Sequence, residues 1–266
     1  MAQPCERAGV LHLSSPVTCI SQRSDSIAIG IHGTPKEVTA DAVILTVPLG
    51  CLQRDRISFT PPLPSRIQSA IANLGFGNLE KVFLKFKHAW WITRSSSNPP
   101  EFYTFLPPHT LPQSAPNQVI SMFSLAGLPI NAQPVLVVYL AGAWSSYLAK
   151  QSLMAIKELF QSIFIPCLPN YSPDCAIMDV LCTNWSDDVY AYGSYTHIPV
   201  GSLDGLEDLR VLGERIYTLN RGTGGLWLAG EHAGTADMGT VNGAMASGAF
   251  AATDVLKSFG ERIENY

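Results

Sequence analysis

The sequence has few charged residues and no excess of basic ones. Asp, Glu, Lys and Arg make up 14% of 266 residues, and the net charge is -4. A chain without a basic field does not attract phosphate backbones, so we expect no direct nucleic-acid partner. The longest apolar run, Val135 to Trp144, is shorter than the roughly 20 residues that cross a bilayer, and a basic-then-apolar signal pattern is absent from the first residues. We therefore predict an intracellular, cytoplasmic protein without a transmembrane segment, with the nucleus and the peroxisome as alternatives.

Several well-marked catalytic and metal-binding motifs are also absent. The six cysteines form no C-x-x-C pair, which favours free thiols and predicts no metal site. The sequence contains no H-E-x-x-H, G-x-S-x-G or P-loop pattern. Residues 75–80 begin like G-x-G-x-x-G but carry Glu80 at the third glycine, and the glycines at 222–225 precede a strand. No dinucleotide fingerprint therefore lies in the required strand-to-helix context.

The hydrophobic pattern predicts alternating strands and helices. The apolar run 42–47 is typical of a parallel strand that is buried on both faces. Residues 81–86 alternate as a strand with one apolar face. Helices are predicted at 146–164 and at about 240–257, where small residues recur at helical spacing. A helix that begins at Thr240 would offer free N–H groups and the positive end of its dipole to an electron-rich or anionic ring.

Five sequence blocks, in this order, resemble those of one enzyme family. They are Thr46-Val-Pro-Leu-Gly50, Phe59-Thr-Pro-Pro-Leu-Pro64, Leu74-Gly-Phe-Gly-Asn-Leu-Glu-Lys-Val82, the aromatic block from Trp185 to Tyr195, and Gly230-Glu231-His232 followed by Thr240-Val-Asn-Gly-Ala244. Together they resemble the flavin-dependent amine oxidases, which include polyamine oxidases, monoamine oxidases and flavin histone demethylases.

The resemblance implies an α/β fold, in which an α+β substrate domain is inserted in a partial, Rossmann-like FAD-binding domain. Residues 1–54 and 221–266 would form the FAD-binding part, and 55–220 the substrate-binding part. The family's G-x-G-x-x-G unit is not found in this sequence, so the resemblance covers the C-terminal half to two thirds of a full enzyme. We accordingly expect the chain on its own to bind FAD poorly, because that loop receives the pyrophosphate.

The resemblance also implies roles for individual residues. Lys81 matches the lysine that holds a water at the flavin N5. Tyr195 matches a tyrosine that stands opposite the flavin face, and Thr240 stands where the second wall of that cage is often Tyr. These three are the predicted catalytic residues. The predicted cofactor-binding residues are Val17, Thr46, Pro48, Trp185, Tyr190, Gly230, Glu231, Thr240, Val241 and Ala244.

The implied activity is oxidation of an amine C–N bond to an imine, with FAD as cofactor and oxygen as acceptor. The substrate would be a small-molecule amine that is polyamine-like or methyl-lysine-like. One alternative is a catalytically silent fragment or divergent ligand-binding protein of the same fold; another is a related flavin oxidoreductase, such as a desaturase. A group of acidic residues could attract a polycation or could be a solvated surface: Asp187, Asp188, Asp204, Glu207 and Asp208.

Overall fold

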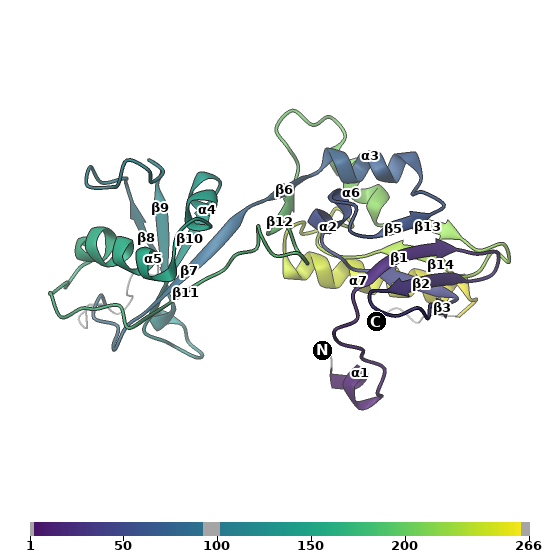
Figure 1. Cartoon of the computed structure of the whole chain (residues 1–266), viewed down its shortest axis with the longest axis horizontal. Coiled ribbons are helices and arrows are strands. Elements are labelled where there is room, and N and C mark those ends of the chain that lie inside the picture. Colours follow the sequence, from purple (N-terminus) through teal and green to yellow (C-terminus); the bar gives the residue numbers. More distant parts are fainter. Residues whose placement is uncertain (1–2, 93–101, 262–266) are drawn as a thin grey trace. The chain divides into compact units, whose positions relative to one another are not determined.

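The chain folds into two compact units in the computed structural model, which describes residues 3–92 and 102–261. One unit, here called the flanking unit, comprises 1–76 and 195–266, and the other, the inserted unit, comprises 77–194 (Figure 1). The division into an FAD-binding and a substrate-binding part has other boundaries and stays a prediction; its residues 1–2 and 262–266 lie outside the described residues.

The flanking unit carries two small mixed sheets and a strand pair. Its described part holds a four-stranded sheet in the order β3-β2-β1-β5 and a three-stranded sheet in the order β13-β14-β4. Strand β1 runs parallel to β5, and β14 runs parallel to β4. The strands are β1 (Val17–Gln22), β2 (Ile27–Ile31), β3 (Val38–Ala40), β4 (Ala42–Leu45), β5 (Ser58–Thr60), β13 (Arg215–Thr218) and β14 (Gly225–Leu228), with β6 (Gly75–Gly77) paired to β12 (Tyr195–His197).

The predicted strand at 42–47 is confirmed in direction but not in burial. Strand β4 pairs in parallel with β14, as the apolar run suggested. However, Ile44 is 36% exposed, so β4 is not buried on both faces. Within the described residues, β4 lies at the edge of the three-stranded sheet, where β14 is hydrogen-bonded to it.

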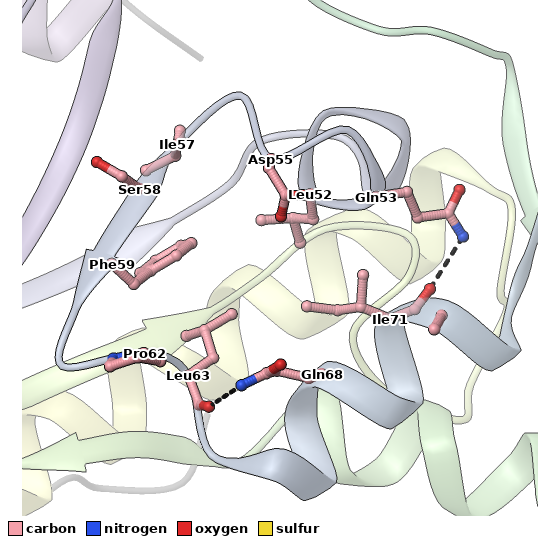
Figure 2. A pocket seen from close by; sticks show the side chains of 11 residues that line it. Leu52, Gln53, Asp55, Ile57, Ser58, Phe59, Pro62, Leu63, Gln68 and Ile71 are labelled. Atoms are coloured by element: carbon pink, nitrogen blue, oxygen red, sulfur yellow. Dashed lines mark hydrogen bonds between the residues drawn. The ribbon is translucent and has the colours of Figure 1, made fainter.

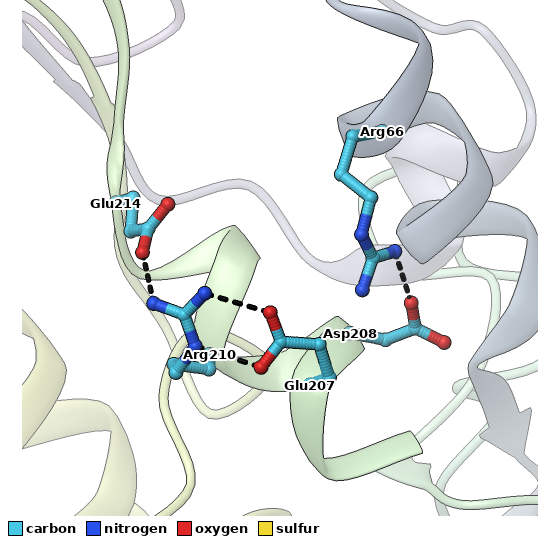
Figure 3. A network of polar contacts seen from close by, with 5 residues as sticks. All are labelled: Arg66, Glu207, Asp208, Arg210 and Glu214. Atoms are coloured by element: carbon cyan, nitrogen blue, oxygen red, sulfur yellow. Dashed lines mark hydrogen bonds and ion pairs between the residues drawn. The ribbon is translucent and has the colours of Figure 1, made fainter. Parts of the chain in front are cut away.

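Helices close the core of the flanking unit. Helices α3 and α6 contact each other and contribute buried Ile67, Ile71 and Leu209 to a core shared with Leu45 and Leu226 of the parallel strands. Figure 3 shows Arg66 of α3 reaching Asp208 of α6. The helices of this unit are α1 (Gln3–Arg7), α2 (Leu49–Gln53), α3 (Ser65–Asn73), α6 (Gly205–Leu212) and α7 (Val241–Ser258).

Helix α7 packs on the parallel strands through small residues. Buried Ala251 contacts Trp227 and Ala229 of the β14 segment, and the indole N–H of Trp227 donates to Asp254 at 2.7 Å. Small side chains at the contact let the helix axis approach the sheet closely. The predicted helix at about 240–257 is thereby confirmed within one residue at each end.

The inserted unit is built on an antiparallel sheet. Within its described residues the strand order is β11-β7-β10-β9-β8, and the helices pack on β10 and β11 (Figure 1). The elements are β7 (Leu79–Lys85), β8 (Phe102–Phe105), β9 (Ile120–Ser124), η1 (Leu125–Gly127), β10 (Val135–Ala141), α4 (Ala143–Leu148), α5 (Leu153–Leu159), the π-helical η2 (Phe160–Phe164), η3 (Ile165–Cys167) and β11 (Asp179–Cys182).

The single helix predicted at 146–164 is wrong. The chain forms α4, breaks, and restarts as α5 where the Ser152 hydroxyl accepts the N–H of Ala155 at 3.2 Å. A serine that caps a helix start in this way competes with helix continuation.

Among the described residues, no helix has the length and apolar character needed to cross a membrane.

Candidate functional site

The N-terminus of α7 has a well-defined cap. The Thr240 hydroxyl accepts the N–H of Gly243 at 3.0 Å and donates to the carbonyl of Asp237 at 2.6 Å. The N–H groups of Val241 and Asn242, in the same first turn, have no carbonyl four residues earlier within the helix. These amides and the helix dipole present partial positive charge to a ligand, as the sequence predicted.

The parallel pair of strands leads Gly230–Glu231 and Thr46–Pro48 to the same edge of the sheet. The N–H of Ala229 donates to the carbonyl of Leu45 at 3.0 Å, so the two chains leave the sheet side by side. Gly230 has φ +144°, and a Cβ there would lie 2.7 Å from the ring of His232. The Ser247 hydroxyl of α7 accepts from the N–H of Gly230 at 2.8 Å, which ties the helix to this edge.

Glu231 and Tyr195 are joined to the start of α7 by short links. The carboxylate of Glu231 accepts the N–H and the hydroxyl of Thr196 at 3.1 and 2.7 Å. The carbonyl of Glu231 accepts the N–H of Gly239 at 3.3 Å. Gly239 has φ +75°, and a Cβ there would lie 3.5 Å from the Tyr195 ring. The structure therefore brings Glu231, Tyr195 and Thr240 together within one unit.

His232 adds a buried imidazole beside this group. It is 1% exposed, and its Nε2 atom has no hydrogen-bond partner among the described residues. Burial lowers the pKa of His232 to about 4, so the ring is neutral near pH 7.

The residues present fit a flavin nucleotide. Each carboxylate oxygen of Glu231 receives one bond from Thr196 and keeps a further lone-pair site, which is what two ribose or ribityl hydroxyls require. Gly230 and Gly239 let the backbone pass close to the His232 ring and to the Tyr195 ring, so that the group packs tightly. The amides at the start of α7 would face the electron-rich pyrimidine edge of a flavin.

Other predicted cofactor residues in the flanking unit have simpler surroundings. Thr46 and Val241 are exposed, and Pro48 and Ala244 are half-buried. Val17 lies at the start of β1, partly buried against the main core of the unit. The roles of these residues in cofactor binding stay predictions.

Lys81 lies in the inserted unit on the open face of β7. Its strand alternates as predicted, with Glu80, Val82 and Leu84 buried and Lys81 half-buried on the other face. The Nζ atom lies 5.7 Å from the centre of the Tyr139 ring, which is its cross-strand partner on β10. An ammonium over an aromatic ring is held by the ring's quadrupole, so Tyr139 orients the Lys81 side chain.

Trp185 and Tyr190 lie in the turn that follows β11 of the same unit. They are 44% and 66% exposed, so neither is a core aromatic. The side chain of Glu80 anchors this turn. Its carboxylate accepts from the Thr183 hydroxyl at 2.6 Å, the N–H of Trp185 at 3.1 Å, the N–H of Ser186 at 3.1 Å and the Ser186 hydroxyl at 3.0 Å.

The sequence analysis missed Glu80, Thr196 and Tyr139. The signal for Glu80 was present, because a carboxylate falls on the apolar face of an alternating strand and needs buried partners. Thr196 and Tyr139 reach their contacts across 35 and 58 residues of chain, for which the sequence carries no local signal.

Two of the five acidic residues that could attract a polycation are paired with arginines. Asp208 is fully buried and pairs with Arg66, whose pKa the contact raises. Glu207 pairs with Arg210, which also contacts Glu214 (Figure 3). These two acids are therefore already compensated, which weakens the case for an acidic attractor.

A hollow of the flanking unit lies away from these residues. It measures about 750 Å³, and none of the predicted site residues lines it within the described chain. Figure 2 shows the amides of Gln53 and Gln68 donating to the backbone carbonyls of Ile71 and Leu63, with apolar side chains between them.

Comparison with known proteins defines the class. Residues 1–256 match the family described as flavin containing amine oxidoreductase, and the chain belongs to that family. Its fold is that of cyclohexylamine oxidase from Brevibacterium oxydans IH-35A, with a TM-score of 0.71 at 16% identity over 98% of this chain and 51% of that one. The predicted fold class is confirmed.

The curated relatives that the chain matches include plant proteins named as histone demethylase homologs. The chain is 31% identical over 82% of its length to lysine-specific histone demethylase 1 homolog 2 of Arabidopsis thaliana. It is 29% identical over 90% of its length to homolog 1 of the same plant, and 28% identical over 98% to homolog 2 of Oryza sativa subsp. japonica. The chain spans 27%, 26% and 32% of the lengths of these three relatives.

Proposed function

We propose that the chain contributes the C-terminal FAD-binding elements and the substrate domain of an amine oxidase that converts an amine C–N bond to an imine, with oxygen as acceptor. The observation that carries this proposal is the group formed by Glu231, Tyr195 and the capped start of α7 in a chain of the flavin amine oxidoreductase family. When bound, the flavin supplies the capacity to accept a hydride from carbon.

The flanking unit would hold the cofactor. Glu231 would accept hydroxyls of the ribose or ribityl chain, with its carboxylate fixed by Thr196. The amides of Val241 and Asn242 would stabilise negative charge that grows at the pyrimidine edge during turnover. Tyr195 and Thr240 would bound the opening through which the amine enters and would align its carbon.

The inserted unit would supply Lys81. An ammonium oriented by Tyr139 can hold a water by donating to its oxygen, and can release a proton from Nζ that the resulting neutral amine later takes back. The substrate class is a methylated lysine or a polyamine; the names of the plant relatives favour the methylated lysine.

The test uses the protein with flavin bound. Stopped flow follows the reduction of the flavin by the amine and its reoxidation by oxygen separately. Lys81→Met is expected to leave flavin bound and to slow reoxidation or imine release by at least about tenfold, since a positioned proton donor contributes on that order. Lys85→Met, an exposed lysine on the same face of β7, is the matched control and is expected to change neither rate.

Tyr195→Ala is expected to slow flavin reduction by the amine, because the donor carbon loses its alignment. If Lys81→Met and Lys85→Met behave alike, Lys81 is an ordinary strand lysine and its catalytic assignment is wrong. If the unsubstituted protein binds flavin and turns over no amine, the catalytically silent alternative replaces the proposal.

A further inference from the structure

Glu80 occupies a position where the strand pattern calls for an apolar side chain. It alternates with Val82 and Leu84 on the buried face of β7 and is 2% exposed. Within the part of the chain that the structure describes, no ion pair includes Glu80. Burial of a charge is costly without compensation, so the contacts of Glu80 must account for its presence.

The compensation comes entirely from one turn. Thr183, Trp185 and Ser186 supply two hydroxyls and two backbone N–H groups, and these use the lone-pair sites of both carboxylate oxygens. We call Glu80, Thr183, Trp185 and Ser186 the Glu80 cluster. Ser186 extends it to the buried Ser145 of α4, whose hydroxyl lies 3.2 Å away.

Thr183 connects the cluster to the backbone of Lys81. A hydroxyl has one hydrogen, and that of Thr183 is donated to Glu80, so its oxygen is free to accept. It accepts the N–H of Lys81 at 2.8 Å, while the N–H of Thr183 donates to the carbonyl of Lys81 at 3.0 Å. Both peptide groups that flank the Lys81 side chain are thus fixed by the residue that Glu80 holds.

The charge of Glu80 is felt across this region. Burial raises the pKa of the Cys182 thiol to about 11, and the Glu80 carboxylate adds to that rise. The Glu80 carboxylate therefore affects the pKa of a neighbouring side chain and also holds the turn in place.

We propose that Glu80 is a positioning residue that aligns Lys81 and Trp185 for the reaction through the Glu80 cluster. This inference rests on the proposed function of Lys81. Glu80 sets the backbone of Lys81 from the buried face of β7, and Tyr139 orients the ammonium on the open face. The same carboxylate fixes the Trp185 backbone, so the lysine and the indole are placed by one group.

The experiment measures alignment directly in the 266-residue chain. Glu80→Gln keeps the size of the side chain but turns an NH₂ group toward donors of the turn. Two readouts follow: acrylamide quenching of Trp185, obtained by difference from Trp185→Phe, and the ¹³C signal of reductively methylated Lys81, assigned with Lys81→Arg. We expect the Lys81 signal to shift and the quenching of Trp185 to rise about twofold, as a residue that is 44% exposed becomes fully exposed.

Asp208→Asn is the matched control, because it alters a buried carboxylate of the flanking unit. It is expected to leave both readouts unchanged whatever it does to stability. If Glu80→Gln lowers the melting temperature and leaves both readouts as in the unsubstituted protein, Glu80 only stabilises the fold and the proposal is overturned.

A second variant covers the case in which Glu80→Gln does not fold. Thr183→Val removes only the hydroxyl between Glu80 and Lys81, and it is expected to shift the Lys81 signal while Trp185 quenching stays nearly unchanged. An unshifted Lys81 signal in that folded variant also overturns the proposal. Neither readout requires turnover, so a failure to oxidise amines would reject the proposed function without deciding the alignment test.

Discussion

Among the residues that the structure describes, each compact unit buries one carboxylate, and the two are compensated in different ways. Glu80 of the inserted unit is surrounded by neutral donors from a turn. Asp208 of the flanking unit is met by the Arg66 guanidinium and by the amide of Asn73 at 3.2 Å. Both carboxylates are at most 2% exposed, so burial alone does not distinguish them.

The different donors around Glu80 and Asp208 indicate different structural roles for the two carboxylates. A cation such as Arg66, whose side chain is 43% exposed, can turn to water when its partner is lost. The backbone N–H groups of Trp185 and Ser186 are held in the turn, so they turn to water only if the turn itself opens. Neutral donors therefore fix geometry, whereas a half-exposed cation mainly balances charge.

The largest effect is expected from Glu80→Ala. It leaves two backbone N–H groups and two hydroxyls without their acceptor, and we expect the free energy of unfolding to fall by about 4 kcal/mol. Urea unfolding measures it, with Glu80→Gln as the milder partner variant. A loss below about 1 kcal/mol would mean that water replaces the carboxylate, and the contrast between the two units would disappear.

Acid should weaken the flanking unit through His232. Its folded pKa of about 4 lies below the ordinary value of 6.5, so the neutral form is favoured by folding. The resulting stability is fully present above about pH 6.5 and is lost as the pH falls toward 4, by about 3 kcal/mol in total. Stability measured against pH in His232→Gln should lack this component; an unchanged profile would contradict the assignment. This control separates histidine titration from the behaviour of the two carboxylates.

Asp208→Asn is expected to cost less than Glu80→Ala. The asparagine can still accept from Arg66, and Arg66 can also reach solvent. The remaining loss should shrink at high salt, because the cation is partly exposed. Urea unfolding at low and high salt measures both points, with Arg66→Gln as the reciprocal variant. A salt-independent loss as large as that of Glu80→Ala would show that the two carboxylates act alike.

The smallest effect is expected from Thr183→Val, which keeps the side-chain shape and removes one hydroxyl. The loss of its bonds to Glu80 and Lys81 should lower the free energy of unfolding by about 1 kcal/mol. Thr104→Val, at an exposed position of β8, is the matched control and should change stability little. Equal losses in the two variants would remove Thr183 from the Glu80 cluster.

Local features of the fold could be predicted from the sequence. The start of α7 at Thr240 followed from a capping residue before small residues at helical spacing, and the alternation of β7 followed from its apolar positions. The break between α4 and α5 could not be predicted, because the apolar stripe continues across it. Ser152 caps the start of α5 after this break. Hydrophobic periodicity indicates which side chains face the core, but it does not indicate where a helix ends.

The candidate site divides in the same way. Thr240, Glu231 and Tyr195 were singled out by resemblance, and the structure adds the links through Thr196 and Gly239 that bring them together. The link from Glu80 to Trp185 depends on a pairing between segments 105 residues apart, and it exists only after the sheet has formed. Long-range hydrogen bonds of this kind leave no spacing signature in the sequence.

The inserted unit begins and ends at one place. The N–H of Ser194 donates to the carbonyl of Gly77 at 2.7 Å, and the Ser194 hydroxyl bonds to Leu79. The 118 residues from 77 to 194 therefore form a closed excursion whose two ends are hydrogen-bonded to each other. A segment of this kind can be exchanged for a relative's segment, or for a short turn, without pulling the flanking chain apart, since the ends to be joined already touch. Transplanting one contiguous stretch of gene would then replace Lys81, Trp185 and Tyr190, while Glu231, Tyr195 and Thr240 stay where they are.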